Sequence, residues 1–153
     1  MLAALLIAPA ATAAPIDTDR SAIFTAAGFA RRGADWRTKD CEGMEGDSYT
    51  PGTIDDYRDV NGDGRPDAMI SEGSGICYGN TGMRFWLLSK APSGKWTVMA
   101  SEVASPELLK TKGAGGWPDI LLGGPGFCFP VMRWNGKAYV GQRNEYEGKP
   151  CKP

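Results

Sequence analysis

Four oxygen-bearing side chains fall at regular spacing in one nine-residue segment of the chain. They occupy its first, third, fifth and ninth positions, and a glycine occupies the sixth, in the sequence Asp59-Val60-Asn61-Gly62-Asp63-Gly64-Arg65-Pro66-Asp67. Ca²⁺ takes about six to eight oxygen ligands, and a glycine within the loop lets the chain turn sharply around the ion. The segment therefore predicts a calcium site with Asp59, Asn61, Asp63 and Asp67 as side-chain ligands and the main-chain carbonyl of Arg65 as a further ligand.

The residues after this segment distinguish it from an EF-hand. An EF-hand carries Glu at its twelfth position and continues into a helix, whereas here that position is Ile70 and the sequence 66–70 is typical of a strand. We therefore expect the loop of a β-hairpin. The alternative is an ordinary Asn-Gly and Asp-Gly turn closed by side-chain hydrogen bonds to the backbone, but such a turn does not require three aspartates that converge on one point.

The surrounding sequence is acidic, which bears on the role of the ion. Residues 51–75 contain two basic residues, Arg58 and Arg65, against six acidic ones, which are Asp55, Asp56, Asp59, Asp63, Asp67 and Glu72. Like charges at this density repel one another unless a cation neutralises them. We therefore expect one Ca²⁺ with a structural role, since a catalytic ion needs an open coordination position and a reacting group beside it.

The calcium segment and the strand expected after it resemble the calcium loop of FG-GAP/VCBS-type repeats. Such repeats occur in integrin-like β-propellers and in many secreted bacterial proteins. The resemblance implies five calcium ligands, which are Asp59, Asn61, Asp63, Arg65 (through its carbonyl) and Asp67. The second half of the chain, from Gly116 to Tyr139, is similar to the hairpin units of small, uncharacterised exported proteins of Gram-negative bacteria.

The chain contains an internal repeat, in residues 59–100 and 111–142. Four elements occur in the same order in each copy: Gly-x-Pro-Asp, Gly-x-Cys, Met-Arg before an aromatic residue, and a Gly-Lys turn before another aromatic residue. Alignment of Pro118 with Pro66 leaves only Asp119, the counterpart of Asp67, among the side-chain ligands, so the second copy predicts no calcium site. A period of about 50 residues built from short strands is typical of stacked four-stranded β units, and two copies predict a small sandwich or a two-unit sheet assembly.

The other segments predict a mostly β domain that begins with one short helix. Residues 17–27 carry acidic residues suited to a helix start, and Gly28 is suited to end that helix. Residues 29–36 predict a hairpin, and residues 106–110 predict one helical turn. Elsewhere, short runs of β-branched and aromatic residues alternate with Gly, Pro, Asn and Asp, which indicates strands joined by tight turns.

The N-terminal residues and the cysteines indicate export. Residues 1–13 are predicted to be a signal peptide, because a short apolar run ends in Ala11-Thr12-Ala13, a small-residue pattern at which signal peptidase cleaves. An even number of cysteines in a small exported domain predicts two disulfides, with all three pairings open, among Cys41, Cys77, Cys128 and Cys151. We expect residues 14–153 to form one β-rich domain in the periplasm or outside the cell, with no insertion into a membrane.

Composition excludes several classes of function. The 153-residue chain has no histidine, which removes His-ligated zinc and the Ser-His and Cys-His nucleophiles. Its 17 basic and 18 acidic residues give a net charge of -1, so no overall positive charge attracts nucleic acid. The cysteines form no C-x-x-C pair, which argues against a zinc ribbon and against a thioredoxin-type redox site.

The leading hypothesis is a non-catalytic, calcium-binding module that interacts with a protein or a cell-envelope glycan. Trp117, Tyr78 and Trp134 are the candidate contact residues, because aromatic side chains stack on sugars and anchor protein interfaces. Trp117 is expected at a turn tip, where an aromatic side chain is hard to bury. The alternative for all three is a place in the core or in cross-strand pairs.

Two other functions remain open from the sequence. A protruding glycine-rich loop, formed by residues 71–82 or 123–130, would favour a periplasmic inhibitor or immunity-type protein that blocks a cell-wall hydrolase. Two carboxylates about 5–10 Å apart across a cleft would favour a hydrolase, and the candidates are Asp55, Asp56, Glu72, Asp119, Glu145 and Glu147. No segment carries a recognised catalytic signature, so we expect no enzymatic activity.

Overall fold

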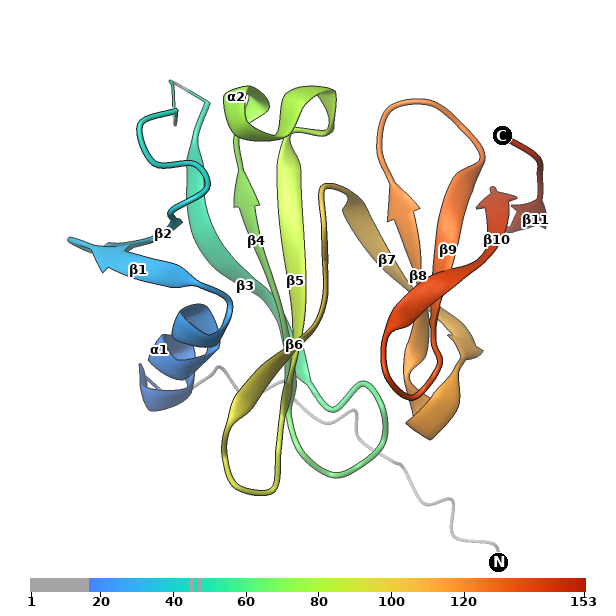
Figure 1. The fold of residues 1–153 in the computed structure, drawn as a ribbon, viewed down its shortest axis with the longest axis horizontal. Helices are drawn as coiled ribbons and strands as arrows, with labels where there is room; N and C mark the ends of the chain where they lie inside the picture. The colour runs from blue at the N-terminus through green and yellow to red at the C-terminus, as the bar shows by residue number, and fades with distance from the viewer. Residues whose placement is uncertain (1–16, 45, 47) are drawn as a thin grey trace, which may run out of the picture.

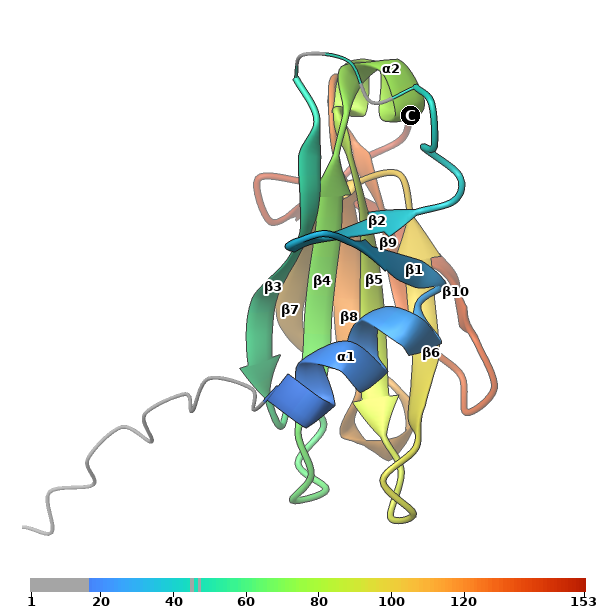
Figure 2. The same ribbon diagram turned by 90° about the vertical axis from the view of Figure 1, so that its left-hand side faces the viewer.

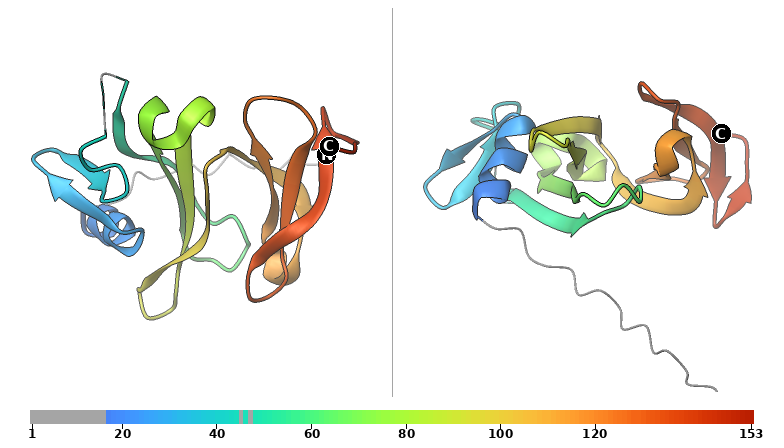
Figure 3. Two further views of the ribbon diagram at one scale, coloured as in Figure 1. Left: turned by 45° about the horizontal axis from the view of Figure 1, so that its top comes forward. Right: turned by 90° about the horizontal axis from the view of Figure 1, so that it is seen from below.

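The chain folds into three layers, as a computed structural model describes for residues 17–44, 46 and 48–153 (Figure 1). A helix and a hairpin form the first layer, a four-stranded antiparallel sheet forms the second, and a five-stranded antiparallel sheet forms the third. Seen from below, the layers follow one another in chain order (Figure 3). The mostly β, disulfide-linked domain predicted from the sequence is confirmed, whereas the predicted signal peptide, residues 1–13, lies outside the described residues.

Helix α1 and the hairpin after it lie in front of the four-stranded sheet (Figure 2). α1 spans Asp17–Ala26, and the acidic side chains in its first turn favour the positive end of the helix dipole. Gly28 stands just past its end with φ +86°, a left-handed conformation that glycine adopts without strain. β1 (Phe29–Arg32) and β2 (Asp35–Thr38) then pair antiparallel around Gly33-Ala34, which confirms the predicted hairpin.

The four-stranded sheet is an antiparallel meander whose two faces are both buried. Its strands are β3 (Thr50–Arg58), β4 (Asp67–Gly73), β5 (Met83–Lys90) and β6 (Trp96–Glu102), in that order across the sheet. Successive side chains of β4 and β5 alternate between two hydrophobic clusters, as the period of a strand requires. Those packed with α1 and the hairpin are Ala68, Ile70, Trp86 and Leu88, and those packed with the second sheet are Met69, Phe85 and Leu87.

The five-stranded sheet is a second antiparallel meander, in the order β11-β10-β9-β8-β7. Its strands are β7 (Ser105–Lys112), β8 (Pro118–Gly123), β9 (Phe129–Trp134), β10 (Tyr139–Tyr146) and β11 (Lys149–Pro150).

The helical turn predicted for residues 106–110 is wrong, because these residues belong to edge strand β7. Pro106 lacks an N–H group, which an edge strand tolerates. Leu108 packs against the cluster between the sheets, and this tertiary contact outweighs the local helical pattern.

Two disulfides and three short helical segments shape the connections. α2 (Gly75–Tyr78) and the 3₁₀ turn η1 (Gly79–Thr81) join β4 to β5, while η2 (Ala114–Gly116) precedes β8. Cys41 pairs with Cys77 and Cys128 with Cys151, which selects one of the pairings left open by the sequence. Within the described residues, no helix has the length and apolar character needed to cross a membrane.

A buried carboxylate, that of Glu72 on β4, ties the first layer to the central sheet. Its residue is 1% exposed, and it accepts hydrogen bonds from the N–H and the hydroxyl of Thr38 on β2, at 3.0 and 2.6 Å. The hydroxyls of Tyr49 and Tyr78 donate to the same carboxylate. Burial, and then the hydrogen bond to Glu72, raises the pKa of both tyrosines, so they remain donors at every physiological pH.

Replacement of this carboxylate by an amide is expected to loosen the first layer. In Glu72→Gln, one acceptor oxygen becomes an NH₂ group that faces the hydroxyl donors, and each lost hydrogen bond to a charged group costs about 1.5–3 kcal/mol. We expect the thermal midpoint to fall by at least about 5 °C. Glu102→Gln, at an exposed glutamate at the end of β6, is the control, and an equal midpoint for the two variants would contradict this role of Glu72.

Candidate metal centre

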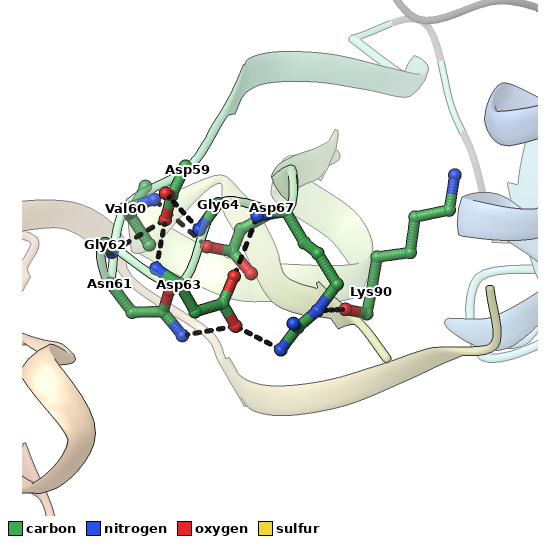
Figure 4. Close-up of polar contacts among 9 residues, drawn as sticks. Asp59, Val60, Asn61, Gly62, Asp63, Gly64, Asp67 and Lys90 are labelled. Atoms are coloured by element: carbon green, nitrogen blue, oxygen red, sulfur yellow. Dashed lines mark hydrogen bonds and ion pairs between the residues drawn. The ribbon is translucent and has the colours of Figure 1, made fainter. Parts of the chain in front are cut away.

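The predicted calcium segment forms the loop of the β3–β4 hairpin. Arg58 and Asp67 are the last cross-strand pair before the loop, and the chain continues into a strand rather than a helix, as predicted. Gly62 and Gly64 both have φ +83°, a region that other residues rarely enter. These two glycines allow the chain to reverse within residues 59–66, so that the loop's carboxylates gather on the inside of the turn (Figure 4).

Asp59 organises the first half of the loop. Its carboxylate accepts hydrogen bonds from the backbone N–H groups of Gly62, Asp63 and Gly64, at 2.7, 3.2 and 2.8 Å. Burial acts to raise the pKa of Asp59, but these backbone hydrogen bonds outweigh it and lower the pKa below its ordinary value. Asp59 is therefore ionised at neutral pH and holds the loop in its turned conformation.

Hydrogen bonds connect Asn61, Asp63 and Arg65 in the middle of the loop, where the side chains of Asn61 and Asp63 lie side by side (Figure 4). Asn61 Oδ1 accepts from the N–H of Asp63 at 3.0 Å, and Asp63 Oδ1 accepts from the N–H of Arg65 at 2.9 Å. The guanidinium of Arg65 donates to Asp63 Oδ2 at 2.5 Å and to the carbonyl of Lys90 at 2.8 Å. A protein cation thus already engages the Asp63 carboxylate.

Asp67, at the start of β4, is the buried acid of the loop. It is 1% exposed, and its Oδ2 accepts from the N–H of Val60 at 3.0 Å. Its Oδ1 is buried and makes no hydrogen bond of regular geometry within the described residues. Burial raises the pKa of Asp67, and the charges of Asp63 and Asp59 add to the shift, while the Val60 N–H and the Ser89 hydroxyl offset part of it.

The loop is not arranged as a finished metal site. Among residues 17–44, 46 and 48–153, no group of three or more Cys, Asp or Glu side chains is positioned to hold a metal ion. The cause lies in the contacts above: the Asp59 carboxylate is turned to backbone N–H groups and that of Asp63 to Arg65. The predicted ligands nevertheless lie together in one hairpin loop, and Asp67 Oδ1 is a buried acceptor without a hydrogen bond of regular geometry in the described part of the chain.

The second sheet contains a buried aspartate, Asp119, that is fully compensated. Asp119 is 0% exposed at the start of β8 and receives hydrogen bonds from the guanidinium groups of Arg133, at 2.9 and 2.8 Å, and Arg143, at 2.8 Å. The hydroxyl of Thr111 donates to it at 2.6 Å. The Arg133 hydrogen bond, helped by Thr111 and Arg143 against the effect of burial, holds the pKa of Asp119 far below its ordinary value.

Strand register shows why the two buried aspartates differ. Asp67 lies opposite Ser89, whereas the pairing of Ile120 with Met132 sets Asp119 opposite Arg133. Two residues before Ser89 on β5, Leu87 lies opposite Ala100. Two residues before Arg133 on β9, Val131 lies opposite Arg143. The two positions that supply guanidinium groups in the second sheet are therefore occupied by serine and alanine in the first, so Asp67 forms no ion pair among the residues that the structure describes.

This contrast was not predicted from the sequence. Asp119 was predicted to be the counterpart of Asp67, as the last remaining residue of a ligand set. Part of the signal was available in Arg133, the basic residue of a strand, β9, that is otherwise apolar. Its pairing with Asp119, and the contribution of Arg143 from β10, required the strand register. The Met-Arg element of the predicted repeat does not occupy equivalent positions in the two sheets. Met83 lies opposite Gly73 at the beginning of β5, whereas Met132 lies opposite Ile120.

Of the three candidate contact aromatics, Trp117 and Tyr78 are buried and Trp134 is partly buried. Trp117 is 6% exposed and packs between the two sheets, so the expectation of an exposed turn-tip tryptophan is wrong. Its ring centroid lies 6.4 Å from that of Trp134, which is partly buried in the same cluster. Tyr78 is buried and donates to Glu72. The apolar cluster between the sheets takes up Trp117 completely and Trp134 in part, so neither Trp117 nor Tyr78 offers an open stacking face.

The candidate carboxylates are distributed over the structure. Glu72 and Asp119 are buried and engaged by the donors described above. Asp55 accepts from the hydroxyl of Thr53 at 2.8 Å, and Asp56 pairs with Arg58 at 2.7 Å, both on β3. Glu145 and Glu147 line a cavity on the five-stranded sheet. A second cavity, of about 500 Å³, lies between α1, the first hairpin and β3 and is bordered by Trp36.

Comparisons with known proteins do not supply a family. No protein-family model, no curated protein sequence and no solved structure matches the chain. The resemblance of residues 59–67 to FG-GAP/VCBS calcium loops therefore stays a prediction from the sequence, and the assignment of the site depends on its own geometry.

Loss of the Asp119 charge is expected to weaken the second sheet in a pH-dependent way. Asp119→Asn leaves two guanidinium groups facing a neutral amide, and breaking a buried ion pair costs about 3 kcal/mol. Because the pKa of Asp119 is lower in the folded than in the unfolded protein, its stabilisation is complete above about pH 4 and is lost as the pH falls further.

Thermal melts between pH 7 and pH 2 test this effect. The difference between wild type and Asp119→Asn should be largest at neutral pH and should shrink at acid pH. Asp40→Asn removes an exposed carboxylate that lies 3.2 Å from Arg84, and it should cost less than about 1 kcal/mol. A difference between wild type and Asp119→Asn that is small at pH 7, or constant down to pH 2, would count against this role of Asp119.

Proposed function

We propose that the protein is a calcium-binding interaction module of the periplasm or cell exterior and that it has no catalytic activity. The observation that carries the proposal is the buried carboxylate of Asp67, whose Oδ1 makes no hydrogen bond of regular geometry within the described residues. The equivalent Asp119 is neutralised by two arginines of the chain itself. A divalent cation would supply in the first sheet the charge that Arg133 and Arg143 supply in the second.

The chemistry of the loop suits Ca²⁺. Hard oxygen atoms from carboxylates, an amide and a main-chain carbonyl are the ligands that this ion prefers, and they would come from Asp59, Asn61, Asp63, Arg65 and Asp67. The bound ion would neutralise three carboxylates that otherwise repel one another. The Arg65 guanidinium, which now engages Asp63 Oδ2, would compete with the ion for that oxygen.

A structural role for the ion follows from the position of the loop. Residues 59–66 join β3 to β4, and β4 lies inside a sheet that is covered on both faces. Stabilisation of the loop therefore stabilises the centre of the molecule. The proposal assigns no reaction, because the buried carboxylates Glu72 and Asp119 are occupied by structural donors.

The cysteines support the proposed location outside the cytoplasm. Both disulfides join residues distant in the chain, and such bonds persist in oxidising surroundings outside the cytoplasm. Export to the periplasm or the medium, after removal of residues 1–13, is part of the proposal. The partner would be an envelope protein or glycan.

An inhibitor of a cell-wall hydrolase is the second candidate, favoured by two protruding loops. Ile76, in the loop of residues 71–82, is 63% exposed, and Phe127, in the loop of residues 123–130, is 72% exposed. Both loops lie at the upper end of the molecule (Figure 1), and a disulfide anchors each. An inhibitor would slow the clearing of a peptidoglycan suspension by added lysozyme, whereas a module without this function would leave the rate unchanged.

Calcium is expected to raise the thermal stability of the protein. A ligand at 100 times its dissociation constant stabilises the folded state by about 2.7 kcal/mol, so residues 14–153 should melt several degrees higher in millimolar Ca²⁺ than in EGTA. Asp67→Asn and Asp63→Ala should abolish the shift. Asp55→Asn, at an exposed acid of β3 outside the loop, should retain it.

An arginine introduced beside Asp67 should stabilise the protein in place of the metal ion. Ser89→Arg places a guanidinium opposite Asp67, as Arg133 stands opposite Asp119. We expect this variant to melt higher than wild type in EGTA and to gain less from Ca²⁺. An unchanged wild-type midpoint on addition of Ca²⁺, or a calcium response in Ser89→Arg as large as that of wild type, would refute the proposed site.

A further inference from the structure

A cavity of about 400 Å³ opens on the five-stranded sheet. Its apolar lining comes from four side chains on four neighbouring strands: Leu109, Leu121, Phe129 and Tyr146. We call this cavity the cup. A volume of this size accommodates one long side chain together with parts of its neighbours, and the apolar lining favours a ligand with methylene groups.

Aromatic rings extend this apolar surface beyond the cup. The Tyr146 centroid lies 6.2 Å from that of Phe129 and 6.4 Å from that of Phe127, the latter at an interplanar angle of 81°. Phe127 is the most exposed large apolar side chain among the described residues, and Phe127 and Tyr146 belong to neither hydrophobic cluster. Three rings are thus held together at the surface without a packing role in the core.

The charge around the cup is negative. Three glutamates line it, Glu107 on β7, Glu145 on β10 and Glu147 after β10, and no basic residue is among its lining residues. Arg143 pairs with Glu145 at 2.5 Å. Within the described residues, Glu107 and Glu147 form no ion pair. An apolar cavity with two uncompensated carboxylates at its border is complementary to an amphipathic cation.

The backbone at the cup is held in unfavourable conformations. Cys128, with φ +60°, and Glu147, with φ +50°, are the two non-glycine residues with positive φ in the described part of the chain. Cys128 stands between Phe127 and Phe129 and is fixed by its disulfide to Cys151. Glu147 and Gly148 form the two-residue turn between β10 and β11, where Asn or Gly is the residue of choice. Strain of this kind concentrates at functional sites.

We propose that the cup binds the side chain of a lysine or arginine of a partner polypeptide. The methylene stem lies against Leu109 and Leu121, the cationic group approaches Glu107 and Glu147, and the rings of Phe129 and Tyr146 add a cation–π contribution. A polypeptide fits better than a free amine, because the exposed Phe127 lies outside the cup. The residues on either side of the bound lysine or arginine would cover Phe127, which a free amine could not do.

The proposal is independent of the calcium loop. The cup belongs to the five-stranded sheet, whose buried aspartate is neutralised by Arg133 and Arg143. Binding to the cup should therefore be equal in EGTA and in millimolar Ca²⁺. Failure of the calcium experiment leaves this inference standing, and failure of the experiment below leaves the calcium site standing.

The test uses acetylated, amidated pentapeptides and the amide NMR spectrum of the mature protein. The peptide Gly-Leu-Lys-Leu-Gly should shift, saturably, the resonances of Leu121, Phe129 and residues 145–148. The same peptide with Gln in place of Lys should bind at least tenfold more weakly. Glu107→Gln and Glu147→Gln should each weaken binding several-fold, whereas the exposed control Glu102→Gln should leave it unchanged.

The variant Glu147→Asn distinguishes an effect on peptide binding from an effect on stability. Asparagine adopts positive φ at lower cost than glutamate, so this variant should melt at a higher temperature than wild type and yet bind the lysine peptide several-fold more weakly. A role confined to the turn would change the midpoint alone, which would overturn the proposal. Equal binding of the Gln and Lys peptides would also overturn it, and equal binding of butylamine would overturn a polypeptide as the occupant.

Discussion

The compensation of buried carboxylates is the constraint on which the rest of this structure depends. An ionised carboxylate loses several kcal/mol of hydration on burial and needs hydrogen bonds or a cation in return. Glu72 obtains neutral donors from Thr38, Tyr49 and Tyr78, and Asp119 obtains guanidinium groups. Asp67 obtains the Val60 N–H on one oxygen, while the other has no regular hydrogen bond within the described residues. Because both faces of its sheet are covered, Asp67 cannot turn to water without opening the β3–β4 hairpin.

The two sheets therefore meet the same electrostatic requirement by different means. Arg133 and Arg143 are part of the chain, so the charge opposite Asp119 is present under all conditions in which the protein folds. A metal ion opposite Asp67 would be exchangeable, and its contribution to stability would follow its concentration. On this interpretation the central sheet responds to calcium and the five-stranded sheet does not, although their strands follow the same meander.

Local features of the fold were predictable, whereas features that depend on pairing between distant strands were not. Gly28, Gly33 and the glycines of the β3–β4 loop act through their own backbone conformations, so the helix end, the first hairpin and the β3–β4 hairpin could be recognised from neighbouring residues. β7 was missed because its burial comes from the opposite sheet. Trp117 was placed at the surface because its turn was read without the cluster that covers it. The contrast between Ser89 and Arg133 requires the register of two hairpins, which no local pattern contains.

The ends of β4 connect the proposed ion site to the protruding loops. The strand begins at Asp67 in the lower part of Figure 1 and runs upward to Glu72 and the α2 connection. Glu72 binds Tyr78 of α2, and Cys77 of the same helix is linked to Cys41. A cation at Asp67 would therefore stabilise the strand that carries the exposed Ile76 loop, while the cup, in a sheet with its own arginines, would keep its shape without the ion. On the two proposals made above, the molecule would combine one surface loop that depends on calcium with a binding cavity that does not.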